Sequence, residues 1–195
     1  MAKLKSSLLN MFLSLTVICV VAAAILAFVN NQTSPLIAES KKVKLENAIK
    51  EVVPGFDNSP LEEAYTVNAE DGSILTIYPA NKGGNPIGAA VESSTMKGFS
   101  GEIKILVGIT PSGEIIDYAV LQHSETPGLG DKMDPWFKTE KNKQNILGRD
   151  LSKGVLSVSK DGGDVDAITA ATISSRAFLD AVNKAYASYS GSIQK

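Results

Sequence analysis

The sequence begins with a long apolar run. In the longer part that follows, apolar and polar residues alternate at the short intervals of helices and strands. Residues 8–29 carry no charged side chain, and Asn10, Ser14 and Thr16 are polar exceptions among them. As a helix that rises about 1.5 Å per residue, this run spans about 33 Å, which is enough to cross the hydrocarbon core of a bilayer. The pattern predicts one transmembrane helix within residues 1–30.

A cleaved signal peptide is the alternative for this segment, because Lys3 and Lys5 make a basic start and residues 22–24 are small alanines. The apolar run is longer than the about 7–15 residues typical of signal peptides, which favours a permanent span. The two lysines favour a cytoplasmic N-terminus, although lysines at positions 41, 42 and 44 weaken the charge difference. We therefore expect a single-pass protein of the cytoplasmic membrane whose C-terminal domain is extracytoplasmic, as in the periplasm.

Residues 31–55 are expected to form a connecting helix between the anchor and the domain. Ser34 is a suitable N-cap and Pro35 fits the first helical position, so the pattern predicts a new helix start there. Apolar positions at helical spacing continue to about Val53, and Pro54 with Gly55 ends the pattern.

From residue 64 onward, the period changes to that of strands, and residues 56–195 are expected to form one domain. Turn residues such as Asp71-Gly72 separate the apolar segments, and short connections of this kind join antiparallel neighbours. The strands expected are residues 65–67, 74–78, 87–91, 103–109 and 115–121.

The last third of the chain favours helices. A short helix is predicted at 135–145, a strand at 155–159 and a final helix at 175–189. The final helix places Phe178, Val182, Ala185 and Tyr189 on one face for the sheet. The predicted fold class is therefore α+β: one N-terminal transmembrane helix, then a mixed, mainly antiparallel sheet with packed helices.

Composition excludes several functional classes. The 19 basic and 21 acidic residues give a net charge of −2, which offers no reason to expect nucleic-acid binding. The single cysteine, Cys19, lies in the apolar run and excludes an internal disulfide framework. With one histidine and no calcium-loop spacing, the sequence predicts no metal site.

Residues 166–174, Asp-Ala-Ile-Thr-Ala-Ala-Thr-Ile-Ser, precede Ser175, Arg176 and an amphipathic stretch. The first turn of a helix has free N–H groups and the positive end of the helix dipole, which together favour an anion. Arg176 adds a charged donor. The segment therefore predicts a phosphate site, while the alternative is that its hydroxyls only cap the helix.

Residues 125–132, Glu-Thr-Pro-Gly-Leu-Gly-Asp-Lys, contain a predicted type II turn with Pro127 second and Gly128 third. The second glycine, Gly130, permits a flat ring to approach the backbone. Leu129 stands between the two glycines as an exposed apolar side chain suited to cover one face of a ring.

Taken in chain order, residues 125–131 and then residues 166–172, the two segments resemble the motifs of the FMN-binding domain family. Asp166, Thr169, Ala171 and Thr172 match D-x-x-[ST]-G-A-T, whose final threonine carries flavin mononucleotide (FMN) through a phosphoester, and residues 125–131 match E-T-P-G-L-G-D. With its anchor, the whole chain is similar to the G subunits of Rnf complexes, membrane-bound ferredoxin:NAD oxidoreductases that couple electron transfer to ion translocation. The C subunits of sodium-pumping NADH:quinone reductases share both motifs and the single span, and they are the alternative resemblance.

The resemblance implies roles for the phosphate segment. Thr172 holds FMN covalently, while Thr169, Ser174 and Ser175 bind phosphate oxygens or cap the helix. Asp166 serves recognition by the flavin transferase that attaches FMN.

For the loop, the resemblance implies contact with the isoalloxazine ring. Thr126, Leu129 and Gly130 are the expected contacts, and Lys132 is a possible partner for the N1–O2 edge of the ring. Glu125 either joins them or fixes the loop through backbone N–H groups.

Three further residues near these motifs have structural alternatives. Phe99, in a glycine-flanked segment ahead of a strand, is expected in the core or at the rim of the flavin pocket. His123 and Trp136 are expected to be structural, with proton transfer and flavin stacking as the alternatives.

Ala170 stands where the family usually has glycine. If this position requires a positive φ, alanine costs about 1 kcal/mol there. If it does not, the backbone is ordinary and the departure has no consequence.

The resemblance implies an electron carrier that works with the other membrane and redox subunits of an Rnf-type complex. The sequence contains no G-x-G-x-x-G fingerprint and no obvious catalytic triad, so no residue is assigned a catalytic role and the chain alone is not a complete enzyme. The alternative from another class is a cofactor-free, membrane-anchored assembly or binding module.

Overall fold

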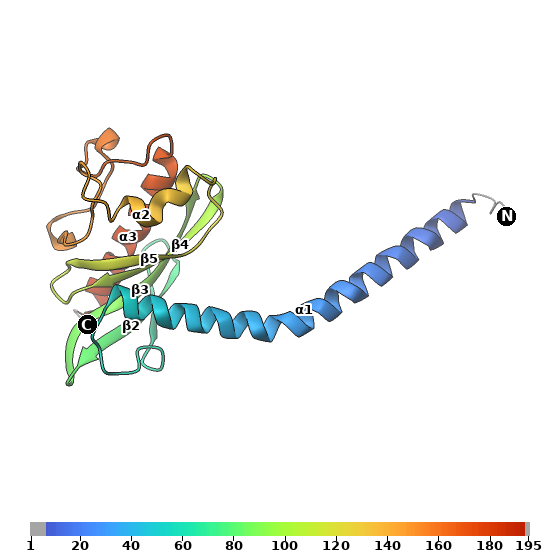
Figure 1. The fold of residues 1–195 in the computed structure, drawn as a ribbon, viewed down its shortest axis with the longest axis horizontal. Coiled ribbons are helices and arrows are strands. Elements are labelled where there is room, and N and C mark those ends of the chain that lie inside the picture. The colour runs from blue at the N-terminus through green and yellow to red at the C-terminus, as the bar shows by residue number, and fades with distance from the viewer. Residues whose placement is uncertain (1–6, 194–195) are drawn as a thin grey trace. The chain divides into compact units, whose positions relative to one another are not determined.

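The computed structural model describes residues 7–193. The chain divides into two compact units, Met1–Lys44 and Leu45–Lys195. The first is the main part of one long helix, α1 (Leu8–Val52), whose last turns belong to the second unit (Figure 1). The second unit contains the sheet and the remaining helices.

Helix α1 is continuous, so the predicted new helix start at Ser34 is wrong. Pro35 lies inside the helix, and the Ser34 hydroxyl donates to the carbonyl oxygen of Asn30 at 2.7 Å, one turn back. The hydroxyl of Thr33 does the same toward Val29 at 3.0 Å. Both hydroxyls thus bond within the helix, and the missing N–H of Pro35 does not end it.

The N-terminal part of α1 is long and apolar enough to cross a membrane. Its most apolar window has a mean hydropathy of 2.8, and its side chains are exposed. The basic residues Lys3 and Lys5, used above to predict orientation, lie outside the described residues.

Five antiparallel strands form one sheet in chain order, which confirms the predicted hairpins. The strands are β1 (Tyr65–Asn68), β2 (Ile74–Lys82), β3 (Asn85–Gly98), β4 (Gly101–Ile109) and β5 (Ile115–His123). Bulges interrupt the pairing of β2 with β3 and of β4 with β5. The β3–β4 hairpin also shifts register between Thr95 and Gly98, near the loop that carries Phe99.

A long helix packs against each face of the sheet. Alternate residues of β4, including Ile105 and Val107, belong to the core that contains α3 (Thr172–Ile193), which crosses the sheet in Figure 1. Leu106, between them, packs with Ile49 and Val52 from the end of α1. The α+β class is confirmed, and β4 is buried on both sides because it lies between two helices.

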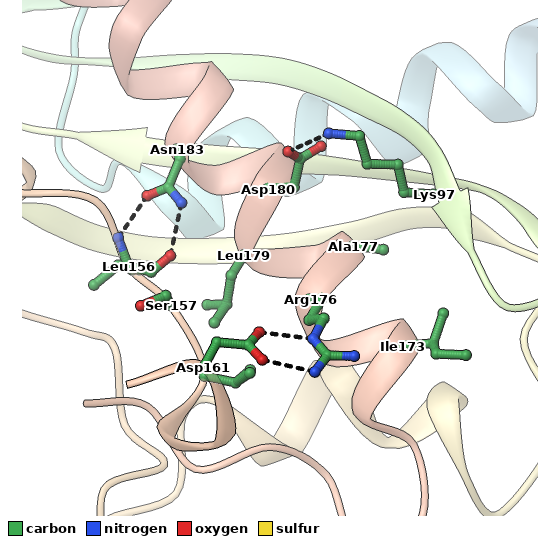
Figure 2. A pocket seen from close by; sticks show the side chains of 11 residues that line it. Lys97, Leu156, Ser157, Asp161, Ile173, Arg176, Ala177, Leu179, Asp180 and Asn183 are labelled. Carbon is green, nitrogen blue, oxygen red and sulfur yellow. Dashed lines mark hydrogen bonds and ion pairs between the residues drawn. The ribbon is translucent and has the colours of Figure 1, made fainter. Parts of the chain in front are cut away.

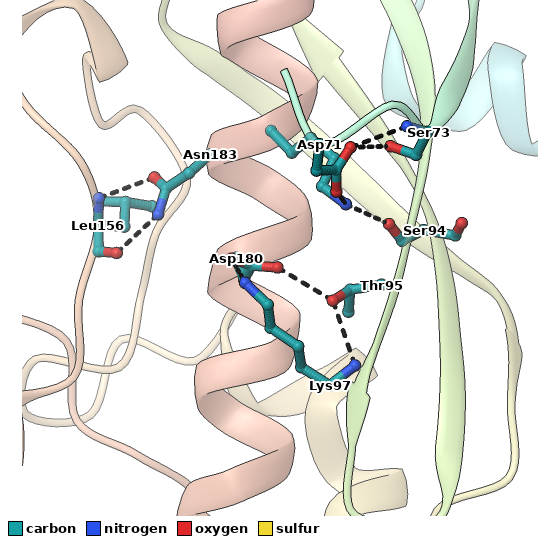
Figure 3. A network of polar contacts seen from close by, with 9 residues as sticks. Asp71, Ser73, Ser94, Thr95, Lys97, Leu156, Asp180 and Asn183 are labelled. Atoms are coloured by element: carbon teal, nitrogen blue, oxygen red, sulfur yellow. Dashed lines mark hydrogen bonds and ion pairs between the residues drawn. The ribbon is translucent and has the colours of Figure 1, made fainter. Parts of the chain in front are cut away.

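Polar contacts fix α3 against the sheet and a neighbouring loop (Figure 3). Asp180 of α3 accepts hydrogen bonds from Thr95 at 3.0 Å and from the ammonium of Lys97 at 2.8 Å. One turn later, the Asn183 amide bonds both the N–H and the carbonyl oxygen of Leu156, each at 2.8 Å. These contacts set the rotation of the helix and therefore the direction of its first turn.

Two predicted elements are wrong. The helix at 135–145 is reduced to α2 (Met133–Trp136), after 3-10 helix η1 (Gly130–Lys132). Residues 138–145 are largely polar and supply no apolar face, and Asn142 has a left-handed φ of 54°.

The predicted strand at 155–159 is a single bridge from Val158 to Val165, next to 3-10 helix η3 (Ser159–Asp161). A further 3-10 helix, η2 (Leu151–Lys153), lies in the same connection. The final helix also begins at Thr172, earlier than the predicted start at 175.

Gly108 allows the end of α1 to approach the sheet, because a Cβ there would lie only 2.0 Å from the Val52 carbonyl oxygen. We expect Gly108→Ala to lower the free energy of unfolding by about 2 kcal/mol, since both atoms belong to packed backbone. Urea unfolding of the detergent-solubilised protein measures this. Gly191→Ala, where a Cβ meets nothing within 4 Å, should instead stabilise the protein slightly. Equal effects of the two substitutions would contradict the packing argument.

Candidate functional site

The two sequence motifs meet at one cavity of about 380 Å³. It lies between the 125–130 loop, the turn before α3 and the first turn of α3. Its apolar lining comes from Phe99, Leu129, Ala170, Ala171 and Ile173. Its polar lining comes from Glu125, Thr126, Lys160, Thr172 and Ser174, with Gly130 between the two kinds.

The loop has the predicted type II turn. The Leu129 N–H donates to the Thr126 carbonyl oxygen at 3.1 Å, and Gly128 has the positive φ of 79° that its position requires. This turn presents Leu129, which is 39% exposed, to the cavity. Thr126, Leu129 and Gly130 all line the cavity, as expected for the loop contacts.

Glu125 ties the loop to two other segments. Its Oε2 accepts a hydrogen bond from the Ser174 hydroxyl at 2.6 Å, and its Oε1 accepts one from the Ser100 N–H at 3.1 Å. Both side chains of the Glu125–Ser174 pair are buried. Glu125 thus holds its loop through one backbone N–H, that of Ser100 in another segment, and it also lines the cavity.

This pair also gives Gly130 a second role, which the sequence pattern does not predict. A Cβ at Gly130 would lie 2.5 Å from the Ser174 hydroxyl and 2.6 Å from Glu125 Oε2. The absence of a side chain therefore makes room for a buried hydrogen bond between two segments, in addition to any approach of a ring.

Ser175 caps the turn before α3. Its buried hydroxyl accepts from the Ile168 N–H and donates to the Ala171 carbonyl oxygen, both at 2.9 Å. Ser175 thus has the capping role of the two that were expected, whereas the Ser174 hydroxyl bonds Glu125, which is neither capping nor phosphate binding.

Thr172 is the first residue of α3 and lines the cavity. The ammonium of Lys160, in η3, donates to its Oγ1 at 3.1 Å. Lys160 was not predicted, because a lone lysine twelve residues upstream has no sequence pattern that links it to the threonine. Thr169 is exposed and lines an adjoining cavity of about 450 Å³, which shares Lys160, Ala170 and Thr172 with the first.

Arg176, the cation expected to help bind phosphate, points to a different partner. Its Nε and Nη2 donate to the two carboxylate oxygens of Asp161, each at 2.7 Å (Figure 2). The guanidinium holds the pKa of Asp161 below its usual value, and the carboxylate raises the pKa of Arg176. The expectation for Arg176 is thus wrong, and Lys160 takes the position beside Thr172.

Other predicted residues separate into cavity and non-cavity positions. Lys132 is exposed in η1 and does not line the cavity, so it is separate from the expected loop contacts Thr126, Leu129 and Gly130. Phe99 is 67% exposed at the rim of the cavity rather than in the core. His123 accepts the Glu125 N–H through Nδ1 at 3.2 Å, and Trp136 donates to the Asp166 carbonyl oxygen at 2.9 Å.

Asp166 fixes the start of the phosphate segment. Its carboxylate accepts from the Ser159 hydroxyl at 2.6 Å and from the Lys143 N–H at 3.2 Å. These hydrogen bonds, the first more than the second, lower the pKa of Asp166. Among the described residues, no group of three or more His, Cys, Asp or Glu side chains is arranged to hold a metal ion.

Ala170 has a φ of 63°, the left-handed conformation that favours glycine. Of the two alternatives stated for this position, the strained backbone is the one observed. We expect Ala170→Gly to raise the free energy of unfolding by about 1 kcal/mol, because glycine removes the clash of Cβ with the carbonyl oxygen. Urea unfolding of the purified protein tests this. A matched Ala171→Gly change, at a buried position without positive φ, should destabilise, and stabilisation by both changes would contradict the assignment.

The lowered pKa of Asp166 predicts a pH dependence of stability. The carboxylate stabilises the fold above its unfolded pKa of about 3.9, and that contribution is lost as pH falls through the lower folded pKa. Asp166→Asn should therefore be less stable than wild type at neutral pH, with a difference that shrinks in acid. Urea midpoints measured from about pH 6 to about pH 2.5 test this. A constant difference across this range would count against the carboxylate, and Asp134→Asn in α2 is the control.

Comparisons with known proteins agree with this geometry. The FMN-binding domain family matches residues 98–187, which include both motifs. The G subunit of the ion-translocating oxidoreductase complex of Photorhabdus laumondii is 35% identical over 88% of this chain and 85% of its own length. The corresponding subunit of Shewanella loihica is 32% identical over 97% of this chain and 90% of its own length.

The same subunit of Yersinia pestis is 36% identical over 84% of this chain and 81% of its own length. These similarities extend well beyond the FMN-binding domain, and they support the resemblance to G subunits. The chain belongs to the family of G subunits of ion-translocating oxidoreductase complexes.

Proposed function

We propose that this chain is an electron-carrier subunit that holds FMN covalently at Thr172. The observation that carries the proposal is the contact of Lys160 with Thr172 Oγ1 at 3.1 Å, at the edge of the cavity formed by the two motifs. A phosphoester on this oxygen would lie beside a cation and at the N-terminus of a long helix, and both favour an anion.

The cavity fits the ring part of FMN in chemistry as well as position. Leu129, Phe99 and Ile173 supply partly exposed apolar surface that a flat ring can cover. Its volume of about 380 Å³ falls within the range of small-molecule sites. Thr126 adds a polar group at the loop.

The bound flavin supplies one- and two-electron transfer, and the residues of this chain position it. Lys160 neutralises phosphate charge, while Glu125 and Ser174 hold the loop and helix at a fixed separation. Asp166 keeps the 166–172 segment in place through Ser159 and Lys143. Its exposure to the adjoining cavity supports the proposed recognition by a flavin transferase.

The proposed partners are the other membrane and redox subunits of an Rnf-type complex. The relatives are named as G subunits of an ion-translocating oxidoreductase complex, and α1 is suited to anchor the domain at a membrane. We propose that the domain lies on the periplasmic side and passes electrons between neighbouring redox centres during ferredoxin:NAD oxidoreduction. A covalent link keeps the cofactor on the protein in a compartment that does not replace it.

In-gel flavin fluorescence after denaturation tests the covalent site. We expect the full-length protein, coexpressed with a flavin transferase, to give a fluorescent band that is absent in Thr172→Ala. Thr172→Ser retains the hydroxyl and should retain the band. Peptide mass spectrometry locates the adduct. A dark wild-type band would overturn the proposal and favour the cofactor-free anchored module.

Lys160→Met separates the cation from the attachment residue. We expect it to slow flavin attachment about tenfold, because it removes a charge-assisted contact to the reacting oxygen. Lys153→Met, which removes a lysine whose side chain is 81% exposed in η2, is the matched control. Equal attachment rates in the two variants would show that Lys160 has no role in flavin attachment.

A further inference from the structure

Glu125 is a buried carboxylate on the wall of the cavity. The function proposed above gives it a structural role and no role in electron or proton transfer. The residue is 5% exposed, and its carboxylate accepts hydrogen bonds from the neutral Ser174 hydroxyl and the neutral Ser100 N–H. Among the residues that the structure describes, no lysine, arginine or histidine forms an ion pair with it. A buried charge without a cation is costly unless hydrogen bonds compensate it.

A neutral amide could make the same structural tie. Glutamine at this position can accept from the Ser100 N–H through its oxygen and donate to the Ser174 hydroxyl through its nitrogen. The chain instead has an acid there, and the two residues packed against its carboxylate, Gly98 and Gly130, have no side chains. A Cβ at Gly98 or Gly130 would lie 2.7 Å or 2.6 Å from a Glu125 oxygen. The structural role therefore does not account for the ionisable group.

We propose that Glu125 takes up a proton when the flavin in this cavity is reduced. The inference rests on the proposed function. When a one-electron donor reduces the flavin, one proton from bulk solvent would protonate the Glu125 carboxylate, which would become a carboxylic acid. The new negative charge on the flavin is thus balanced within the same cavity. Reoxidation removes the electron and returns the proton to water.

Other titratable groups near Glu125 in the structure or the chain lie on η3, β5, η1 and α3. Lys160 of η3 lines the same cavity, but its ammonium contacts Thr172 Oγ1. His123, at the end of β5, meets the Glu125 backbone through Nδ1. Asp131 of η1 follows Gly130 and has one buried carboxylate oxygen with no hydrogen-bond partner among the described residues.

On the helix side, Arg176 is paired with Asp161 and so leaves Ser174 as the α3 contact of Glu125. The charge that changes between the two redox states is that of the flavin. The protonation of Glu125 should therefore follow the redox state.

Redox-difference infrared spectroscopy on the full-length, flavin-loaded protein in detergent tests the proposal, with dithionite as the electron donor. In the reduced form we expect a carboxylic-acid carbonyl band that shifts in deuterated water. The band should be absent in Glu125→Gln and retained in Glu62→Gln, which changes an exposed glutamate outside the cavity lining. The midpoint potential of Glu125→Gln should also depend less on pH than that of the wild type.

A Ser174→Ala variant keeps the proposal testable if Glu125→Gln does not fold or load flavin. Loss of the hydroxyl donor makes the carboxylate easier to protonate, so the carbonyl band should change frequency and the proton should be taken up at higher pH. If Glu125 only held the segments together, Ser174→Ala would change neither the frequency of the band nor the pH of proton uptake.

The outcomes separate this inference from the function on which it rests. A wild-type protein that carries flavin but shows no carboxylic-acid band, or one whose band persists in Glu125→Gln, overturns the role of Glu125 and leaves the flavin carrier in place. An unchanged band and proton uptake in Ser174→Ala also overturn it. A wild-type protein without flavin overturns both.

Discussion

The hydrogen bond between Glu125 and Ser174 is the contact on which the site depends. It joins the loop after β5 to the first turn of α3, and the second oxygen of Glu125 extends the connection to the β3–β4 hairpin through Ser100. Three segments far apart in the sequence thus converge on one buried side chain. This convergence holds the loop that carries Leu129 beside the helix start that carries Thr172, on the two sides of the cavity.

The buried face of α3 gives this contact a rigid support. The Phe178 ring stacks on Phe137 with centroids 4.6 Å apart and meets Tyr118 of β5 edge-on at 4.9 Å. The Tyr118 hydroxyl donates to the Met133 carbonyl oxygen at 2.8 Å, and burial raises its pKa. These rings pack α3 against the sheet and against the residue that follows α2, which supports the start of the helix beside the loop that follows β5.

The sequence was sufficient for elements whose pattern is local. Alternating apolar residues and turn pairs predicted all five strands, and the apolar face of α3 was found from its helical spacing. The continuous α1 was missed because Pro35 resembles a helix start and its tolerance inside a helix has no signal in the sequence. The partners of Arg176 and Thr172 were missed for another reason. Asp161 and Lys160 are adjacent in the chain, and only the 3-10 turn of η3 decides which of them meets which residue of α3.

Ala170 shows how local strain and long-range contacts act on the same few residues. Its left-handed φ turns the chain sharply before α3, and the Ala171 N–H then bonds the Ile168 carbonyl oxygen at 2.9 Å. Ser175 holds the same turn through Ile168 and Ala171, so the strained residue is enclosed by hydrogen bonds on both sides. A relaxed φ at Ala170 would break this turn and redirect Thr172 away from Lys160. The turn therefore retains its conformation without the usual glycine because the surrounding contacts outweigh the about 1 kcal/mol that alanine costs there.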